Sequence, residues 1–320
     1  MWPFSRTCQS KVRLVGKTVL ITGANTGIGK EAAKDLYRRG ARVILACRDL
    51  TKANAAAEEV KSTLPLKPNR QQFQGEVGEV VVYKLNLNSL ASVRECAKQI
   101  INSEPNIHIL INNAGVMLCP YEKTEDGNEC HLQSNHLGHF LLTLLLLPKI
   151  KVSAPGCRII NVSSVAHERG RMNWNDLNLE NSYTPMKGYT QSKLANVLFS
   201  RGLVNKFKEA KIEGINVYSL HPGVIATELG RHLDSAMFPG ARALFGFIIG
   251  NFVKTPDQGC QTTIHCAVDE EAGNQTGLYY KECAVASASP NTQSDTDALK
   301  LWEESTKMVK LTKEEDPFTV

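Results

Sequence analysis

The sequence predicts an α/β fold in which one doubly wound parallel sheet carries helices on both faces. The first reason is that strand-like apolar runs alternate with helix-like segments between residues 18 and 220, the pattern of successive βαβ units. The second is a glycine turn, 22–29, which separates the first apolar run from the first helix-like segment. A strand, a glycine turn and a helix in this order are typical of folds that bind a phosphate group at the helix N-terminus.

The composition restricts the class of protein. The chain has 320 residues, of which 42% are hydrophobic and 22% charged, an ordinary globular profile. Its net charge of +5 comes from scattered basic residues, which does not indicate nucleic-acid binding. Nine dispersed cysteines without a CxxC pair favour reduced thiols over a disulfide scaffold or a metal site. We therefore expect a cytosol-facing protein that is not secreted and holds no metal.

The predicted elements follow in order along the chain. Strands are expected at 18–21, 43–47, 80–83, 107–111, 158–162, 215–220 and 277–280, and helices at 30–37, 52–63, 89–103, 127–147 and 187–210. The residues beyond 280 form a charged and polar tail. No linker divides the chain, so we expect a single domain over 17–320. The preceding segment, 1–16, is either frayed or touches a membrane surface through Trp2 and Phe4. No run approaches the roughly 20 apolar residues of a spanning helix.

Polar residues follow several of the predicted strands. Arg48 ends the second strand, where such folds bind the adenosine ribose, and a cation there suits a 2′-phosphate. A solvated strand-end arginine explains Arg48 equally well, and the neighbouring Asp49 complicates the local charge. The amide turn 112–115 and Ser164 also follow strands, at the edge where α/β folds place ligands. Ser164 could instead cap a helix.

Tyr189 and Lys193 are four residues apart on a predicted helix, so both side chains project from one face. A lysine in this position would stabilise a tyrosinate and lower the pKa of the phenol, which suits proton transfer. By itself, this spacing more often represents a surface pair. His136 and His139 have no partners at metal spacing, and we interpret them as core or surface histidines.

Taken together and in this order, these motifs resemble the short-chain dehydrogenase/reductase family, over about residues 17–280. Longer runs at 19–29, 46–49, 161–167, 192–198 and 221–224 are similar to its retinol dehydrogenase branch. The resemblance implies a single-domain, Rossmann-like, doubly wound sheet of about seven parallel strands. It also implies an enzyme of the EC 1.1.1 class.

The resemblance implies a role for each matching residue. Tyr189 would be the acid that protonates the carbonyl oxygen, and Ser164 would orient that carbonyl. Lys193 would bind the nicotinamide ribose and depress the Tyr189 pKa, while Asn135 would hold a water that resupplies protons. Thr227 would bond the nicotinamide carboxamide. The residues implied to bind the cofactor are Gly23, Asn25, Thr26, Gly27, Ile28, Gly29, Arg48, Asn86, Leu87, Asn113, Ala114, Gly115, Tyr189, Lys193, Pro222, Gly223, Val224 and Thr227.

Two positions bear on the choice of cofactor. In relatives that prefer NAD(H), an acid occupies the position of Cys47; its absence, with Arg48 following, favours NADP(H). NADP(H) in turn favours reduction as the working direction. Asn86 replaces the family's usual Asp near the adenine amine and retains an acceptor oxygen.

The substrate side is less defined by sequence. The segment 227–256 contains Phe247 and other apolar residues, and a hydrophobic lid there would suit an apolar substrate. An amphipathic helix on the core or an interfacial membrane contact would explain it equally. We expect Ser164 and Tyr189 to contact the substrate, with Met117 and His167 lining the opposite wall. The branch usually begins with an apolar anchor, which this sequence lacks, so the protein could be soluble or peripherally membrane-associated, for example at the endoplasmic reticulum.

The leading hypothesis is an NADP(H)-dependent enzyme that interconverts an apolar alcohol with its aldehyde or ketone, retinol and retinal foremost. One alternative is a carbonyl reductase acting on steroid or lipid-derived aldehydes. An alternative of another class is a catalytically idle nucleotide-binding scaffold. The family often forms homodimers through the helices that carry Asn135 and Tyr189. The apolar stretch 144–147 could serve such an interface or lie buried within the monomer.

Overall fold

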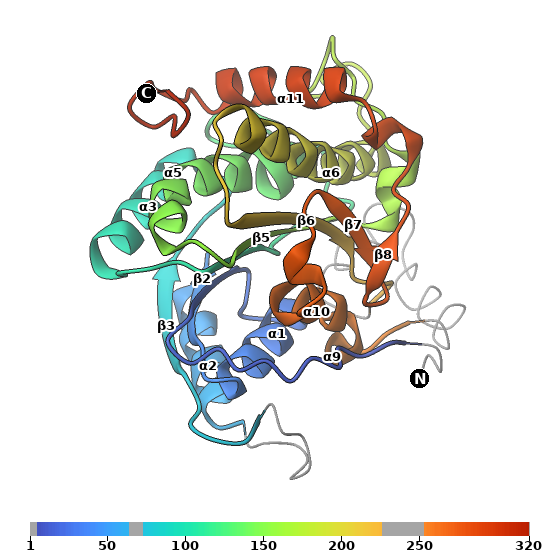
Figure 1. The fold of residues 1–320 in the computed structure, drawn as a ribbon. Helices are drawn as coiled ribbons and strands as arrows, with labels where there is room; N and C mark the ends of the chain where they lie inside the picture. Colours follow the sequence, from blue (N-terminus) through green and yellow to red (C-terminus); the bar gives the residue numbers. More distant parts are fainter. Residues whose placement is uncertain (1–4, 64–72, 226–252, 320) are drawn as a thin grey trace.

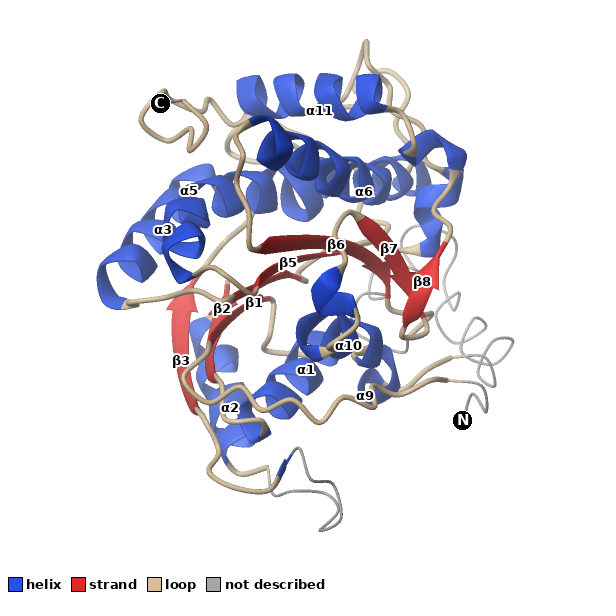
Figure 2. Ribbon diagram, in the orientation of Figure 1, coloured by secondary structure: helices blue, strands red, loops and turns tan. Residues whose placement is uncertain are grey.

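The computed structural model describes residues 5–63, 73–225 and 253–319. Their backbone forms one eight-stranded sheet between two layers of helices (Figures 1 and 2). The strand order is β3-β2-β1-β4-β5-β6-β7-β8. The strands are β1 Thr18–Thr22, β2 Arg42–Cys47, β3 Glu79–Lys84, β4 Ile109–Asn112, β5 Cys157–Val162, β6 Ile215–His221, β7 Leu278–Lys281 and β8 Ala284–Ala286.

The sheet confirms the doubly wound prediction and corrects the strand count. β1 to β7 pair in parallel, and β8 adds an eighth, antiparallel strand. The β7–β8 turn consists of Glu282 and Cys283, both at positive φ. Such two-residue turns usually carry Asn-Gly or Asp-Gly, so this sequence offered no hairpin signal. Strands β2 and β3 are added on one side of β1, and β4 and the later strands on its other side, so the carboxyl ends of β1 and β4 form the switch point where doubly wound sheets bind ligands.

Helices cover both faces of the sheet. One face carries α1 Gly27–Arg38, α2 Leu50–Lys61, α9 Pro256–Gly259 and α10 Gln261–Val268; the other carries α3 Leu90–Ser103, α4 Cys130–Leu132, α5 Gly138–Ser153 and α6 Pro185–Glu209 (Figure 1). Within the described ranges, no helix has the length and apolar character needed to cross a membrane.

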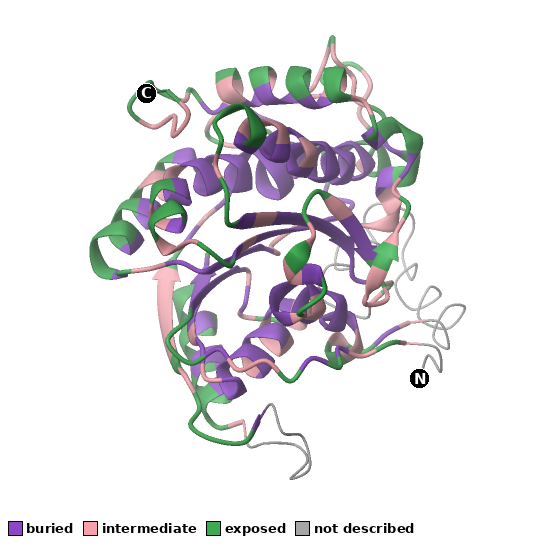
Figure 3. Cartoon of the chain, viewed as in Figure 1, coloured by how far each residue is buried: buried purple, intermediate pink, exposed green. Residues whose placement is uncertain are grey.

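The expected polar tail contains a helix, α11 Asp295–Met308, which packs outside α6 (Figure 1). The Trp302 ring lies 5.1 Å from that of Phe140 and 6.1 Å from that of Phe199. The outer face of α11 is exposed (Figure 3). Its charged residues alternate along the sequence with those of the buried apolar face, so the sequence alone indicates a polar tail. Leu144 and Leu147 are fully buried within the monomer. The apolar stretch considered for a homodimer interface is therefore part of the monomer's own core.

Part of the segment 5–16 packs against the domain, whereas Trp2 and Phe4 lie outside the described residues. Cys8 and Leu14 are buried, and the Cys8 N–H donates to Gln261 Oε1 at 3.1 Å. The Arg39 guanidinium, 1% exposed, donates to the carbonyls of Ser10 and Val12 and to Asp35 Oδ1. A single buried cation thus attaches this segment to α1.

We expect Arg39→Met to lower the free energy of unfolding by about 3 kcal/mol, because it leaves Asp35 and two backbone carbonyls without their donor. Urea denaturation measures this directly. Lys61→Met is the control, since the exposed Lys61–Glu58 pair should contribute less than about 1 kcal/mol. Equal losses in the two variants would contradict the anchoring role of Arg39.

Candidate active site

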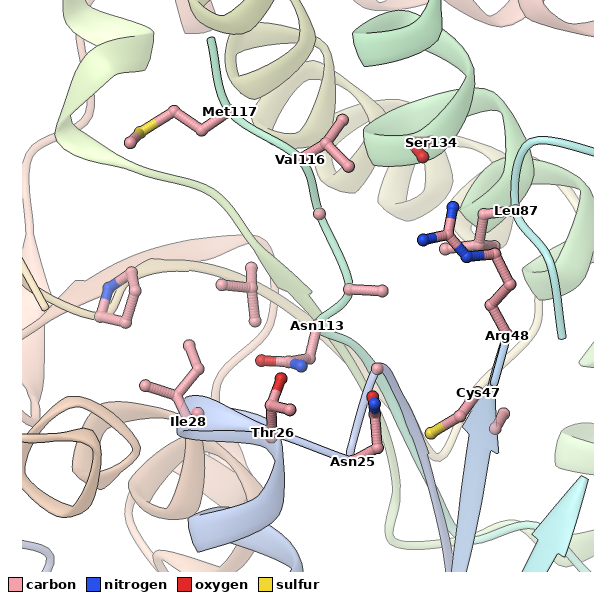
Figure 4. Close-up of a pocket in the computed structure, with 18 of the residues that line it drawn as sticks. Asn25, Thr26, Ile28, Cys47, Arg48, Leu87, Asn113, Val116, Met117 and Ser134 are labelled. Carbon is pink, nitrogen blue, oxygen red and sulfur yellow. The ribbon is translucent and has the colours of Figure 1, made fainter. Parts of the chain in front are cut away.

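A cleft of about 390 Å³ opens at the carboxyl ends of the parallel strands (Figure 4). Nearly all of the predicted cofactor residues among the described parts of the chain line it. These are Gly23, Asn25, Thr26, Gly27, Ile28, Gly29, Arg48, Asn86, Leu87, Asn113, Ala114, Gly115, Tyr189, Lys193, Pro222 and Gly223. Ser164 and Met117 from the predicted substrate side line the same cleft. The arrangement therefore joins segments that are far apart in the sequence into one concave site.

The glycine turn is built by close packing of two loops. Gly23 has φ +66°, and a Cβ placed on it would lie 2.8 Å from the Ala114 Cβ. A Cβ on Gly29 would lie 2.5 Å from Asn113 Nδ2 and 2.8 Å from the Gly23 carbonyl oxygen. Only glycine lets the start of α1 approach the ends of β1 and β4 this closely. The resulting cradle fits a diphosphate at the N-terminus of a long helix.

The end of β2 provides the charge at one side of the cleft. Arg48 is exposed, and its side chain extends across the cleft toward Leu87 and Ser134 (Figure 4). Asp49 caps α2 by accepting from the Lys52 N–H at 3.0 Å, so the neighbouring carboxylate is engaged in the helix terminus. Burial raises the pKa of the Cys47 thiol to about 11, which keeps this position neutral. The combination presents positive charge to a ligand phosphate.

Ser164, Tyr189 and Lys193 come together at the other side of the cleft. Tyr189 and Lys193 lie on the buried face of α6, and the Ser164 side chain is close enough to the Tyr189 hydroxyl to lower its pKa. Lys193 Nζ donates to the Val162 carbonyl at 3.1 Å and lies 5.9 Å from the centre of the Tyr189 ring. Ser164 also caps the short helix 165–169, accepting from the Ala166 N–H at 3.2 Å. Ser164 therefore both caps a helix and lines the cleft.

Burial dominates the titration of this group. It raises the pKa of Tyr189, and Ser164 offsets this only in part. Lys193 does not offset this shift, and burial lowers the Lys193 pKa itself from 10.5 to about 8. The free protein consequently holds Tyr189 as a protonated phenol, the form that can give up a proton.

Asn135 lies behind the cleft and braces it. It belongs to a five-residue π-helical turn, Gln133–Leu137, between α4 and α5. Its Oδ1 accepts from the Val116 N–H at 2.7 Å, and its Nδ2 donates to the Val116 carbonyl at 3.0 Å and to Ser192 Oγ at 2.8 Å. The side-chain amide is thus fully engaged in connecting the loop after β4 with α6.

The buried Lys193 makes the stability depend on pH. Its folded pKa lies below the unfolded value, so between pH 8 and 10.5 the unfolded chain binds more protons, and this contribution to stability rises with pH. We expect Lys193→Met to be more stable than wild type at pH 7, and this advantage to shrink by about 2 kcal/mol by pH 9.5. Chemical denaturation at both pH values measures it. The exposed Lys187, replaced by Met, is the control; an advantage of Lys193→Met that stays constant with pH would contradict the prediction.

Some predicted residues lie elsewhere. His167 is fully buried and does not line the cleft: its Nδ1 donates to the Ser164 carbonyl at 2.6 Å, and its Nε2 accepts from the Ser289 N–H at 3.1 Å. It therefore supports the Ser164 turn instead of forming the substrate wall. Val224 is half exposed and outside the cleft lining. Thr227, Phe247 and most of the segment 227–256 lie outside the described residues.

The cleft also includes residues that were not selected from the sequence. They are Ala46, Cys47, Asp49, Lys52, Leu85, Val116, Ser134, Val162, Ser163 and Ile225. Most adjoin a selected residue and could have been found by extending each motif by one position. Lys52 adjoins no selected residue, and only the packing of α2 brings it to the cleft. Across the described ranges, no cluster of three or more His, Cys, Asp or Glu side chains could hold a metal ion.

A doubly wound sheet with its cleft at the switch point is the architecture of the α/β oxidoreductases that use nicotinamide dinucleotides. This chain belongs to one family of them, the short chain dehydrogenases, whose family model matches residues 17–237.

Individual proteins agree with this assignment. The chain is 47% identical to retinol dehydrogenase 11 of Homo sapiens over 94% of this chain and 88% of that protein. Among solved structures, an uncharacterised protein from Mycobacterium paratuberculosis superimposes with a TM-score of 0.73 at 31% identity, covering 96% of this chain and 98% of that one. The RhlG/NADP complex of Pseudomonas aeruginosa gives 0.63 at 26% identity, covering 83% and 94%.

Proposed function

We propose that this oxidoreductase uses NADP(H) to interconvert an apolar alcohol and its aldehyde or ketone, foremost retinol and retinal, and works as a reductase. The observation that carries the proposal is the protonated, buried Tyr189 beside Ser164 and Lys193, in the cleft that Arg48 enters from the opposite side. The retinol dehydrogenase name of a relative 47% identical over most of the chain supports the substrate class.

The cofactor, when bound, supplies the hydride that reduces the carbonyl carbon. In the proposed reaction, Tyr189 donates the phenolic proton to the carbonyl oxygen, and Ser164 orients that oxygen with a hydrogen bond. Lys193 binds the ribose and lends positive charge to the tyrosinate that forms. The Asn135 amide is fully engaged by Val116 and Ser192, so a relay water would be held by its main-chain carbonyl.

We expect Arg48→Ala to weaken NADPH binding about tenfold, because a charge-assisted hydrogen bond from an exposed side chain to the 2′-phosphate contributes about 1.5 kcal/mol, the lower end of the usual range. NADH, which lacks that phosphate, should bind with nearly unchanged affinity. Quenching of protein fluorescence by each cofactor measures both dissociation constants. Arg201→Ala is the control, because Arg201 lies on α6 outside the cleft lining and pairs with Asp295. Equal weakening of both cofactors by Arg48→Ala would indicate a structural effect and remove this support for NADP(H).

The substrate class is tested separately. We expect purified enzyme with NADPH to reduce all-trans-retinal with a higher kcat/KM than steroid ketones or alkyl aldehydes. A preference for a steroid or a lipid-derived aldehyde would favour the second candidate on the same scaffold. Binding of NADPH without turnover of any carbonyl in the panel would favour the idle nucleotide-binding protein.

We also propose a cytosol-facing location. All nine cysteines are free thiols in the structure, and eight of them are buried, as expected for a protein kept reduced. Peripheral contact with a membrane such as the endoplasmic reticulum would suit an apolar substrate, and vesicle co-sedimentation of the full chain tests it.

A further inference from the structure

His139 connects the two halves of the candidate site through two hydrogen bonds. It lies on the first turn of α5 and is 2% exposed. Its Nε2 lies 2.8 Å from Thr22 Oγ, and its Nδ1 lies 3.0 Å from the Asn135 carbonyl oxygen. Thr22 ends β1 immediately before the glycine turn, whereas Asn135 braces α6. No other role in the proposed reaction uses this histidine.

The surrounding donors define which nitrogen of His139 carries the proton. Thr22 Oγ accepts the N–H groups of Asn113 and Ala114, both at 2.9 Å. The hydroxyl proton of Thr22 is then left to be donated to His139 Nε2, which must be unprotonated. Nδ1 consequently carries the proton and donates it to the Asn135 carbonyl. Burial and the nearby positive charge of Lys193 lower the pKa of His139 to about 4, in agreement with a neutral ring.

The hydrogen bonds form one continuous connection. The amide turn 113–114 bonds to Thr22, Thr22 to His139, and His139 to the Asn135 main chain. Asn135 then bonds through its side chain to Ser192, whose hydroxyl donates to the Tyr189 carbonyl at 2.8 Å. A displacement at either end is therefore transmitted to the other through short, buried bonds.

We propose that His139 is a positioning residue that holds the cofactor-binding turns and the Asn135–Tyr189–Lys193 group in register. It occupies one lone pair of the Asn135 carbonyl, which fixes the direction of the other lone pair for the relay water. This inference rests on the proposed function, since it assigns His139 a role in placing groups that act in that reaction.

The experiment compares four variants of the full chain: His139→Leu, His139→Gln, His139→Asn and, as the control, His136→Leu. His136 lies in the same helical segment, is also buried, and bonds Ser305 on α11, away from the cleft. For each variant we would measure the melting temperature, the NADPH dissociation constant by fluorescence, and kcat and KM for the best carbonyl substrate.

We expect His139→Leu to lower kcat on the order of 100-fold, the effect of misplacing reacting groups by about 1 Å, and to weaken NADPH binding as well. The two conservative variants should separate these losses. Glutamine can still reach Thr22, so NADPH affinity should recover while kcat stays low. Asparagine can still donate to the Asn135 carbonyl, so kcat should recover more than NADPH affinity. His136→Leu should lower the melting temperature and leave kcat within about twofold.

Losses that follow the melting temperature across all four variants, without this separation, would overturn the proposal. If His139→Leu does not fold, NMR of the ring nitrogens in the wild-type protein tests the proposal. We expect a neutral His139 ring protonated at Nδ1, and a ring protonated at Nε2 would overturn the proposal. If wild type reduces no carbonyl, the proposed function fails, but NADPH affinity and the NMR tautomer still test the connection itself.

Discussion

Replacing Tyr189 with phenylalanine is expected to lower kcat for carbonyl reduction by a factor of about 10² to 10⁴, the usual contribution of a general acid. The substitution removes only the hydroxyl next to Ser164 and leaves the ring packed among its buried neighbours. NADPH affinity should change by less than about fivefold, because one neutral hydrogen bond contributes only about 1 kcal/mol. Single-turnover reduction of retinal and fluorescence binding of NADPH separate the two effects.

A second tyrosine provides the matched control. Tyr218 on β6 is also fully buried, and its hydroxyl donates to the Ala272 carbonyl at 2.7 Å, away from the cleft. Tyr218→Phe should reduce stability by about 1 kcal/mol and leave turnover intact. Retention of wild-type turnover by Tyr189→Phe would show that another group supplies the proton.

The second large effect is expected at Gly29. The new methyl group of Gly29→Ala would meet the Gly23 carbonyl oxygen at 2.8 Å and Asn113 Nδ2 at 2.5 Å. The side chain of Asn113 can rotate away, but the Gly23 carbonyl belongs to the turn itself, so the turn must shift. Overpacking of this kind costs about 1–3 kcal/mol, which corresponds to an NADPH affinity about 5- to 150-fold lower if the cost falls on the bound state. Isothermal titration with NADPH measures the loss.

Gly202→Ala is the control for adding a methyl group. Gly202 lies inside α6, and the nearest atoms to its added Cβ are 3.4 Å away. Alanine is favoured over glycine within a helix by about 1 kcal/mol, so this variant should bind NADPH normally and be at least as stable as wild type. Unchanged NADPH affinity in Gly29→Ala would mean that the turn does not hold the diphosphate.

The prediction from sequence succeeded wherever the signal was local and strong. The apolar runs predicted strands at seven places in the chain, and the structure has a parallel strand at each, because buried parallel strands are short and continuously apolar. It missed β8, α9, α10 and α11. The turn before β8 lacks glycine or asparagine, and the apolar stripe of α11 is interrupted by charges that face solvent.

For the candidate site, sequence motifs selected most of the residues that line the cleft, since each motif follows a strand and strand ends share one edge of a parallel sheet. They did not show that His167 supports the Ser164 turn or that Lys52 reaches the cleft. Both depend on how helices and loops pack in three dimensions, which a short-range sequence pattern does not predict.

The sequence alone therefore determined the fold class, the family resemblance and the identity of the Ser164, Tyr189 and Lys193 group. Only the tertiary structure decided the direction in which the pKa values of Tyr189 and Lys193 shift. Spacing predicts that Lys193 lowers the Tyr189 pKa, but both groups are buried, and desolvation raises the pKa of one and lowers that of the other. Tertiary structure also decided that His139 connects Thr22 with Asn135, residues 113 positions apart, because a hydrogen bond depends on distance in space and not on separation along the chain.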